Sequence, residues 1–556
     1  MMKKAKRFMP MALIALLLMG GFQTAFAQKA ATVIPEVVSS QGMVASAHPL
    51  ASEAGLSILK AGGNAVDAVV ATAFANSVVE PNANGLGGEG YVVIYMKADN
   101  KATSIDYRSR ASFNPPREGE KWPNPGHRGT AVPGTVAGLA MALEKYGTMS
   151  LSQVLQPAIK IAEEGFVVSP TLAGVISDNF KRIMQNDYLM SIVAPDGLPL
   201  EAGDVYKNPD LVKSLKLLAA EGADAFYKGE IAKLIVADMK AHDGLIDMND
   251  LAQYKAIERE PATGLYRGYD IVSAPAPVGG FLLIQALNML ENYNLKFLGF
   301  DSAMKLHLFA EVLARSFDDY YNVLGDPDYV DVPMKALTSQ GYADAKAKSI
   351  KLDSMTSKYE KVDPNSEHWS TTHMSVVDKD GNVVALTQTL SSFFGAAVAV
   401  PGTGIILNNE MGNFNGKTGT AAYAPGKRMN TTIAPTLIMK DGQSFATLGT
   451  PGAMRIVPTL AQIVTNLIDY GMGIQEAIEA PRMYCTYLQG AGKTTMELEG
   501  ALFPKKTMDD LALLGYKLKS YDNRDLYFGG VQGIIIKDGK LYGGADPRRD
   551  GAVFGY

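Results

Sequence analysis

A threonine pair in the second half of the chain has the residue type and setting for nucleophilic chemistry. Thr371 lies within residues 370–378, which read Ser-Thr-Thr-His-Met-Ser-Val-Val-Asp. If the peptide bond before Thr371 were cleaved, that residue would carry both a hydroxyl nucleophile and a free α-amine. A free α-amine has a pKa of about 7.7–8, so near neutral pH a useful fraction can take the proton from the hydroxyl. The chemistry would then need no separate histidine or aspartate.

The same run also fits an ordinary structural role. From Thr371 onward, polar and apolar residues alternate as in a half-buried β-strand, where a threonine pair usually has no chemical role. The rest of the chain must therefore decide between a nucleophile and a strand residue.

The N-terminal sequence predicts export. Basic residues within positions 3–7 precede an apolar run at 11–19, and Ala25-Phe26-Ala27 forms a small-residue cleavage motif. Residues 1–27 are therefore predicted to be a secretory signal peptide rather than a membrane anchor, because the apolar run is short. No later segment is apolar for long enough to span a bilayer, so we expect a periplasmic or secreted protein with no membrane association after signal removal.

Composition argues against several function classes. The 556 residues carry a formal net charge of −5 and no basic run after residue 27, so the chain lacks the electrostatic footprint of a nucleic-acid-binding protein. The single cysteine, Cys485, cannot form an internal disulfide. The six histidines show no metal-ligand spacing, and His368 and His373 near Thr371 lack a suitable partner, so we predict no metal and no cofactor. Small-molecule or peptide chemistry is the better expectation.

Hydrophobic periodicity predicts helices in the first two thirds of the chain. Helical spacing is expected over Pro49–Lys60 and over the almost wholly apolar Ala65–Val79, which must be buried between layers. Residues 130–350 are predicted to be mostly helical, with helices such as 136–145 and Leu151–Glu164.

Short β runs predominate after residue 371. Asp-Gly pairs at 380–381, 441–442 and 538–539 join apolar or β-branched runs and predict three antiparallel hairpins with type I′ turns. Helices packed outside antiparallel sheets make a layered α+β domain. A cut before residue 371 would divide this one fold into two chains.

Several segments stand in a distinctive order along the chain. The most specific segment opens at Thr371 and continues through Thr-x-Thr-Leu at 387–390 to Phe-Gly at 394–395. The others are 42–46, 58–68, Gly-Leu-Gly-Gly-Glu-Gly at 85–90, Ala-Val-Pro-Gly-Thr at 131–135, and 324–330. In these segments, their order and their spacing, the chain resembles the γ-glutamyltransferases (γ-glutamyltranspeptidases) from about residue 42 to residue 556. Many segments in the same order are more specific than any one of them.

The resemblance implies a four-layer αββα N-terminal-nucleophile hydrolase fold. It also implies one precursor that cuts itself into a large subunit, residues 28–370, and a small subunit, residues 371–556. Thr371 would attack the γ-glutamyl amide of a glutathione-like donor, and water or an amine or peptide acceptor would resolve the resulting ester. Thr389 matches the family's second threonine, which hydrogen-bonds and orients the nucleophile. The alternative role for Thr389 is that of an ordinary strand threonine.

The family's oxyanion loop matches Gly-Thr-Pro-Gly-Ala at 449–453, with the backbone N–H groups of Gly452 and Ala453 as the two donors. Donation by the main chain explains why alanine can stand at 453, where the family typically has glycine. Without the resemblance, this segment would be interpreted as a turn.

The resemblance also assigns residues to the donor's α-carboxylate. Arg108 is the matching residue, because a guanidinium can bind a carboxylate through two hydrogen bonds, and Arg110 is its rival. Thr431 and Thr432 match the family's paired serines, which donate hydroxyls to the same carboxylate.

The positions that match the α-ammonium site depart from the family pattern. They are Ser391, Glu410 and Asn413, where the commoner residues are Asn, Gln or Glu, and Asp. Because Asn413 is neutral, a glutaryl or other N-acyl donor, or a poly-γ-glutamate chain, is an alternative to a γ-glutamyl donor. The segment 415–426 is short and predicts an open pocket without a lid, with Tyr423 either covering part of the donor or serving as an ordinary loop aromatic.

A third interpretation, from a different class, is an exported binding protein with an inactive site. Thr371, Thr389, Arg108 and the loop at 449–453 are all present, which argues against this interpretation.

Overall fold

The computed structural model of this chain describes residues 35–117, 119, 122, 125–355, 370–414, 419–486 and 494–556. The predicted signal peptide at 1–27 and His368 lie outside these residues. Within them, no helix has the length and apolar character needed to cross a membrane.

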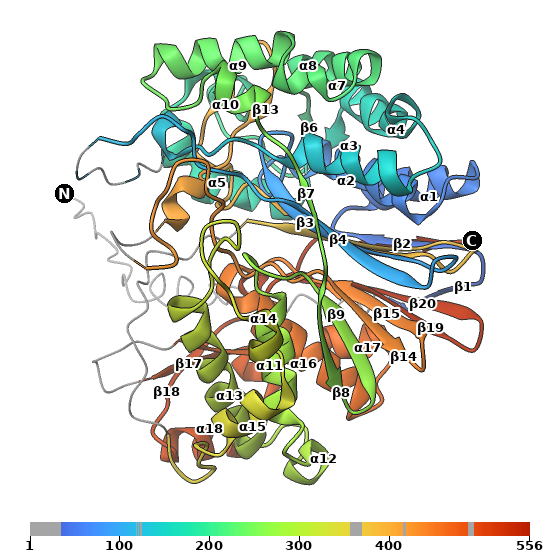
Figure 1. The fold of residues 1–556 in the computed structure, drawn as a ribbon, viewed down its shortest axis with the longest axis vertical. Coiled ribbons are helices and arrows are strands. Elements are labelled where there is room, and N and C mark those ends of the chain that lie inside the picture. The colour runs from blue at the N-terminus through green and yellow to red at the C-terminus, as the bar shows by residue number, and fades with distance from the viewer. Residues whose placement is uncertain are drawn as a thin grey trace, which may run out of the picture. The chain divides into compact units, whose positions relative to one another are not determined.

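Two antiparallel sheets of seven strands each form the two central layers (Figure 1). Sheet A contains, in spatial order, β1 (Val37–Ser39), β20 (Lys540–Ala545), β19 (Gln532–Lys537), β15 (Gln443–Gly449), β14 (Thr436–Lys440), β9 (Tyr269–Ser273) and β8 (Ala262–Tyr266). Sheet B contains β21 (Ala552–Gly555), β2 (Met43–Ser46), β10 (Thr372–Val377), β11 (Val383–Thr389), β3 (Glu89–Met96), β4 (Lys101–Tyr107) and β7 (Ile257–Arg259).

Helices cover the outer face of each sheet (Figure 1). On the side of sheet B lie α1 (Pro49–Lys60), α2 (Ala65–Val79), α3 (Thr135–Tyr146), α4 (Leu151–Glu164), α5 (Pro170–Ile183), α6 (Asp187–Val193), α7 (Pro209–Glu221), α8 (Asp224–Tyr227), α9 (Glu230–Ala241) and α10 (Met248–Ala252). On the side of sheet A lie α11 (Gly280–Leu290), α12 (Leu295–Leu298), α13 (Ala303–Asn322), α14 (Met334–Leu337), α15 (Gln340–Ala347), α16 (Ile456–Ile468), α17 (Ile474–Glu479) and α18 (Lys505–Leu513).

Smaller elements complete the described fold. They are the hairpin β5 (Phe166–Val167) with β6 (Val205–Tyr206), the hairpin β12 (Ala399–Val400) with β13 (Ile405–Ile406), the sheet of β16 (Met483–Thr486), β17 (Thr495–Leu498) and β18 (Lys517–Ser520), and the 3₁₀ turns η1 (His127–Gly129), η3 (Glu410–Asn413), η4 (Ala453–Arg455), η5 (Gly500–Leu502) and η6 (Leu526–Phe528).

Each central sheet contains strands from both sides of Thr371. In sheet B, β10 and β11 lie between β2 and β3, which precede Thr371 in the chain. In sheet A, β14 pairs with β9 and β20 pairs with β1. The predicted αββα arrangement is therefore confirmed, and neither part of the chain holds a complete sheet by itself.

Helix α2 confirms the predicted buried helix with the same bounds. Every residue of α2 is buried. Its N-terminus carries a capping box, in which Asn64 accepts from the N–H of Asp67 and Asp67 accepts from the N–H of Asn64. These reciprocal bonds satisfy backbone donors that would otherwise be unpaired in the core.

The three predicted hairpins are confirmed, but one turn differs from the expectation. Asp441 and Gly442, like Asp538 and Gly539, have the paired positive φ angles of a type I′ turn. At 378–382 only Gly381 has positive φ, and the Asp378 carboxylate accepts from two backbone N–H groups in the connection. A longer turn held by a side chain therefore replaces the expected two-residue turn.

The mostly helical interpretation of residues 130–350 misses five strands, of which β5 and β6 form the small hairpin described above. The other three, β7, β8 and β9, join the central sheets, with β7 at one edge of sheet B and β8 at one edge of sheet A. These strands are short, and their pairing with β4 and β14 is a tertiary contact that local periodicity does not record.

Asp378 joins the β10–β11 connection to helix α2, so its removal should weaken the fold. The carboxylate is buried and accepts from the N–H of Ala65 at 2.8 Å and from Asn382 Nδ2 at 2.7 Å. We expect Asp378→Ala to lower the free energy of unfolding by about 3 kcal/mol, because several buried donors lose a charged acceptor. Urea unfolding and thermal melts by circular dichroism measure this loss. The exposed neighbour Asp380→Ala should change stability by less than about 0.5 kcal/mol, and equal losses in the two variants would contradict this role.

Candidate active site

Thr371 lies at the start of strand β10, beside the end of strand β11. The two strands are antiparallel with Thr372 opposite Gln388, a register that brings Thr371 next to Thr389. Thr371 Oγ1 donates a hydrogen bond to Thr389 Oγ1 at 3.0 Å. Both side chains are buried. The strand pairing thus places the predicted nucleophile in contact with the residue predicted to orient it.

Further hydrogen bonds hold the residues around this pair. Thr389 Oγ1 also accepts from the N–H of Ser391 at 2.8 Å and lies 3.2 Å from Ser370 Oγ. Ser370 Oγ donates to the carbonyl of Ala83 at 3.1 Å, and the backbone N–H of Ser370 donates to the carbonyl of Ser391. The residue before Thr371 is therefore held as firmly as Thr371 itself.

The backbone of Thr371 is strained. Its φ angle is 140°, a value that a β-branched L-residue rarely adopts. Strain of this kind costs about 1–3 kcal/mol and persists only where surrounding contacts enforce it. One such contact is Arg549, whose Nη1 donates to the Thr371 carbonyl at 2.8 Å. Because φ includes the carbonyl carbon of Ser370, breaking the Ser370–Thr371 bond would relieve this strain.

A cavity of about 40 Å³ adjoins the Thr371 hydroxyl. The sequence-predicted residues that line it are Thr371, Thr389, Ser391, Glu410, Asn413, Thr431, Thr432 and Ala453. Four further residues line it that were not predicted from the sequence: Tyr320, Asn430, Met454 and Ile456. Asn430 could have been found, because it directly precedes the threonine pair, and its Nδ2 donates to the carbonyl of Leu324 within one of the matching segments.

The loop at 449–453 ends on two residues with positive φ. Gly452 has φ 135° and Ala453 has φ 51°. Within the described part of the chain, neither backbone N–H donates a hydrogen bond, which leaves both available for a ligand oxygen. Thr432 Oγ1 donates to the carbonyl of Ala453 at 2.6 Å and so holds the peptide unit that directly follows these two N–H groups. The left-handed φ at 453 gives a physical reason for the glycine that is typical of the related family.

Arg108 lies behind the cavity wall rather than in it. Its guanidinium is fully buried and forms ion pairs with Glu89 and Glu410. Nη2 lies 2.9 Å from Glu410 Oε2 and 3.2 Å from the carbonyl of Met429. The rival Arg110 donates to the carbonyl of Asp250 and does not line the cavity.

Comparison with known proteins identifies this arrangement. A family model described as Gamma-glutamyltranspeptidase matches residues 51–556. The chain belongs to the gamma-glutamyltranspeptidase family. The predicted family, its αββα fold and the predicted class of enzyme, a γ-glutamyltransferase, are therefore confirmed.

Several relatives match this gamma-glutamyltranspeptidase over nearly their whole length. The chain is 40% identical over 552 residues to the glutathione hydrolase proenzyme of Escherichia coli (strain K12), covering 94% of this chain and 93% of that protein. It is 41% identical over 529 residues to the acylase ACY 1 proenzyme of Pseudomonas sp. (strain SE83), covering 92% and 93%. The crystal structure of cephalosporin acylase from Bacillus halodurans superposes with a TM-score of 0.87 at 30% identity, covering 94% and 97%.

In this gamma-glutamyltranspeptidase, Asn413 acts as a donor to Glu410. Its Nδ2 lies 2.6 Å from Glu410 Oε2, the same oxygen that accepts from Arg108. Ser391 Oγ is buried at the cavity and has no hydrogen-bond partner within the described residues, so it can serve a ligand.

Tyr423 packs in a small aromatic cluster and does not line the cavity. Its ring lies 5.5 Å from Phe414 and 5.6 Å from Trp122, and its hydroxyl donates to the carbonyl of Ser112. Two roles were predicted for Tyr423, and this arrangement fits the role of an ordinary loop aromatic. Residues 415–418 of the short segment lie outside the described residues.

His373 is a structural residue of strand β10. Burial lowers its pKa to about 3, so the ring is neutral at physiological pH. Nδ1 and Nε2 form hydrogen bonds with the hydroxyls of Thr387 and Ser375, respectively. These bonds occupy both ring nitrogens that could bind a metal.

Glu80 lies on the other side of β10 from the cavity and has an unusual ionisation. It accepts from Thr372 Oγ1 at 2.6 Å. Burial raises its pKa to about 7, although the nearby Arg549 and the Thr372 hydrogen bond act in the opposite direction. The sequence offers no sign of this shift, because the shift arises from the burial of Glu80 at the C-terminal end of α2.

The raised pKa of Glu80 predicts a pH-dependent stability. In the folded chain the Glu80 carboxyl keeps its proton up to about pH 7, whereas in an unfolded chain it releases the proton near pH 4.5. The free energy of unfolding should therefore fall as the pH rises from about 4.5 to about 7, and it should level off above pH 7. The decline is about 3 kcal/mol. We expect Glu80→Gln to remove this decline, as measured by urea unfolding from pH 4 to pH 8 in a Thr371→Ala background, which lacks the predicted nucleophile.

The exposed Glu53→Gln, made in the same background, is the matched control and should keep the full decline. If the Glu80→Gln and parent chains showed parallel pH profiles, Glu80 would titrate at its ordinary pKa.

Proposed function

We propose that this chain is a self-processing γ-glutamyl hydrolase and transferase that acts on glutathione-like donors. The observation that carries the proposal is the Thr371–Thr389 hydroxyl pair at a strained backbone junction. The E. coli relative's name, glutathione hydrolase proenzyme, supports both the donor and the precursor.

Self-cleavage begins at the Ser370–Thr371 bond. The Thr371 hydroxyl attacks the carbonyl carbon of Ser370, the C–N bond breaks, and the acyl group moves from nitrogen to oxygen. Water then hydrolyses this ester to give a carboxylate on Ser370 and a free α-amine on Thr371. Relief of the strained φ favours the reaction. The products are a large subunit, 28–370, and a small subunit, 371–556.

In turnover, the new α-amine takes the proton of the Thr371 hydroxyl, which attacks the γ-carbonyl of the donor. The N–H groups of Gly452 and Ala453 stabilise the oxyanion. The tetrahedral intermediate collapses with loss of the protonated leaving amine and leaves a γ-glutamyl ester on Thr371. Water completes hydrolysis, and an amine or peptide acceptor completes transfer.

Donor binding exchanges the partners of a buried ion pair. The α-carboxylate takes the Arg108 guanidinium, with Thr431 as a hydroxyl donor and Thr432 as a second one after it leaves the Ala453 carbonyl. The α-ammonium takes Glu410, with Ser391 and Asn413 beside it. The Arg108–Glu410 contact supports this exchange, because a zwitterion can replace each partner with a group of the same charge. The cavity is much smaller than the roughly 300 Å³ of ordinary ligand sites, so we expect donors to bind after cleavage.

A related N-acyl amidase, such as a glutaryl acylase or a poly-γ-glutamate-type enzyme, is the second candidate. Asn413 favours it, because an amide stands where the family commonly has an aspartate. The Pseudomonas relative named acylase ACY 1 proenzyme also favours it. The predicted signal peptide at 1–27 supports a periplasmic or secreted location for either enzyme.

The proposal requires Thr371 for both maturation and turnover. We expect wild-type protein to run as two fragments on denaturing gels and Thr371→Ala to remain a single chain without activity, because alanine has no nucleophile. Thr371→Ser keeps a hydroxyl and is the matched control, which should cleave at a reduced rate. Normal cleavage of the alanine variant would remove Thr371 from the mechanism.

The charge at position 413 should set the preference between donors. Asn413→Asp adds a second anion beside Glu410 and should raise the ratio of kcat/KM for γ-glutamyl over glutaryl anilide about tenfold or more, since one charge-assisted contact contributes roughly 1.5–3 kcal/mol. Parallel assays of the two anilides measure the ratio. Asn413→Ala removes the amide without adding charge and serves as the control. A flat or falling ratio would show that residue 413 does not act on the ammonium.

A further inference from the structure

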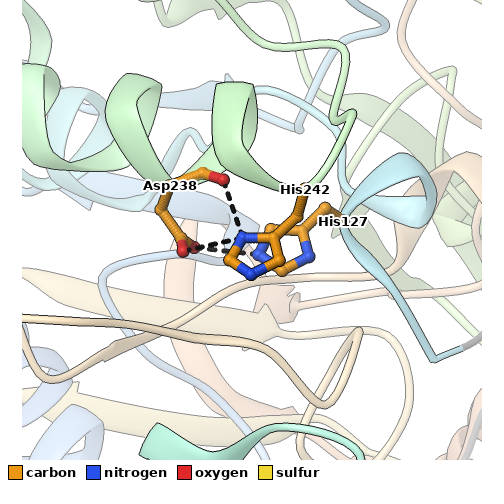
Figure 2. Close-up of side chains that lie close together, drawn as sticks. All are labelled: His127, Asp238 and His242. Atoms are coloured by element: carbon orange, nitrogen blue, oxygen red, sulfur yellow. Dashed lines mark hydrogen bonds and ion pairs between the residues drawn. The ribbon is translucent and has the colours of Figure 1, made fainter.

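We infer that His127, Asp238 and His242 form a binding site for a divalent metal ion, remote from Thr371 (Figure 2). The histidines show no metal-ligand spacing in the sequence, but Asp238 lies in the last turn of α9 and His242 is the C-cap of that helix. The fold then brings His127 of η1, more than a hundred residues away, to the same point. Two histidines and one carboxylate are a ligand set of known zinc sites.

The three side chains already have contacts close to those of a coordination sphere. His127 Nε2 lies 2.9 Å from Asp238 Oδ2, and His242 Nδ1 lies 3.2 Å from Asp238 Oδ1. Ligand atoms about 2.1 Å from a tetrahedral Zn²⁺ lie about 3.4 Å apart. The two separations, each to a different oxygen of Asp238, are within about 0.5 Å of that value. All three ligand atoms lie within 4.8 Å of one another.

The burial of the set also fits a metal. The Asp238 side chain is only 7% exposed, and both of its oxygens contact an imidazole nitrogen. A carboxylate taken out of water requires a cation or strong donors nearby. Two imidazole nitrogens and one carboxylate oxygen are a donor set that Zn²⁺ binds well, leaving further coordination positions for water or another ligand.

One adjustment is needed for an ion to enter. The two rings are stacked, with centroids 4.3 Å apart and an interplanar angle of 10°, so their nitrogen lone pairs do not yet meet at one point. His242 also donates from Nδ1 to the carbonyl of Asp238 at 2.9 Å. Its side chain is 53% exposed and can turn, whereas His127 is nearly buried and stays in place.

The surroundings provide access for an ion. The three residues line a cavity of about 370 Å³, which Asp187 also lines. Ala397 and Pro401, from the part of the chain after Thr371, line the same cavity. The turn η1 packs against η3, which carries Glu410 and Asn413, and Gly126 donates from its N–H to the carbonyl of Ala396. An ion here would fasten η1 to α9 within the predicted large subunit, and η1 in turn packs against η3 of the predicted small subunit.

The test uses the whole processed protein, without a polyhistidine tag, stripped with a chelator and dialysed. Titration calorimetry with ZnCl₂ should show one equivalent bound per processed molecule with a micromolar or lower Kd, and Zn²⁺ should raise the melting temperature. Co²⁺ should give visible absorption bands from nitrogen and oxygen ligation. His242→Gln should weaken Zn²⁺ binding at least tenfold and lose these bands.

Lys240→Gln, on the same helix, is the matched control and should bind as wild type does. Asp238→Asn provides a second variant that keeps the side-chain shape. No Zn²⁺ binding by wild type at 100 times the protein concentration would overturn the inference, as would equal affinity in wild type and His242→Gln. Either result would mean that the imidazoles only satisfy the buried carboxylate.

Discussion

The hydrogen bond between the hydroxyls of Thr371 and Thr389 depends on one strand register. The pairing of β10 with β11 sets it, and a slip by one residue would turn each side chain to the opposite face of sheet B. Such a slip is costly because both strands are buried on both faces, between a helical layer and sheet A. The flanking strands β2 and β3 fix the same register from either side. The geometry at Thr371 is therefore enforced by the core of the whole fold.

The same architecture explains how strain can persist at the junction. Ser370 is held by the carbonyls of Ala83 and Ser391, and the Thr371 carbonyl is held by Arg549 near the C-terminus of the chain. A bond anchored on both sides cannot relax by moving its ends. Since each sheet combines strands from before and after Thr371, cutting this bond removes the local constraint without unpairing the sheets.

Local features were predictable from the sequence, and features made by distant contacts were not. Helix α2 was found with its bounds because its residues are almost wholly apolar over a helical length. The hairpins were found because Asp-Gly pairs encode their turns. The raised pKa of Glu80 and the meeting of His127 with α9 depend on burial and on segments far apart in sequence. Family resemblance located the residues around the cavity, but it did not show that Arg108 lies behind Glu410.

The buried charges beside the cavity bear on the choice of donor. Glu89, Arg108 and Glu410 form one cluster with two acids and one base, a formal charge of −1 that the neutral Asn413 does not change. A γ-glutamyl group brings an ammonium and a carboxylate, so binding it leaves that charge as it was. A glutaryl group brings a carboxylate alone and would raise the buried charge to −2, which is unfavourable where water is excluded. Under the proposed function, the amide at 413 would weaken recognition of the ammonium, whereas the Arg108 cluster would still favour a zwitterionic donor over an anionic one.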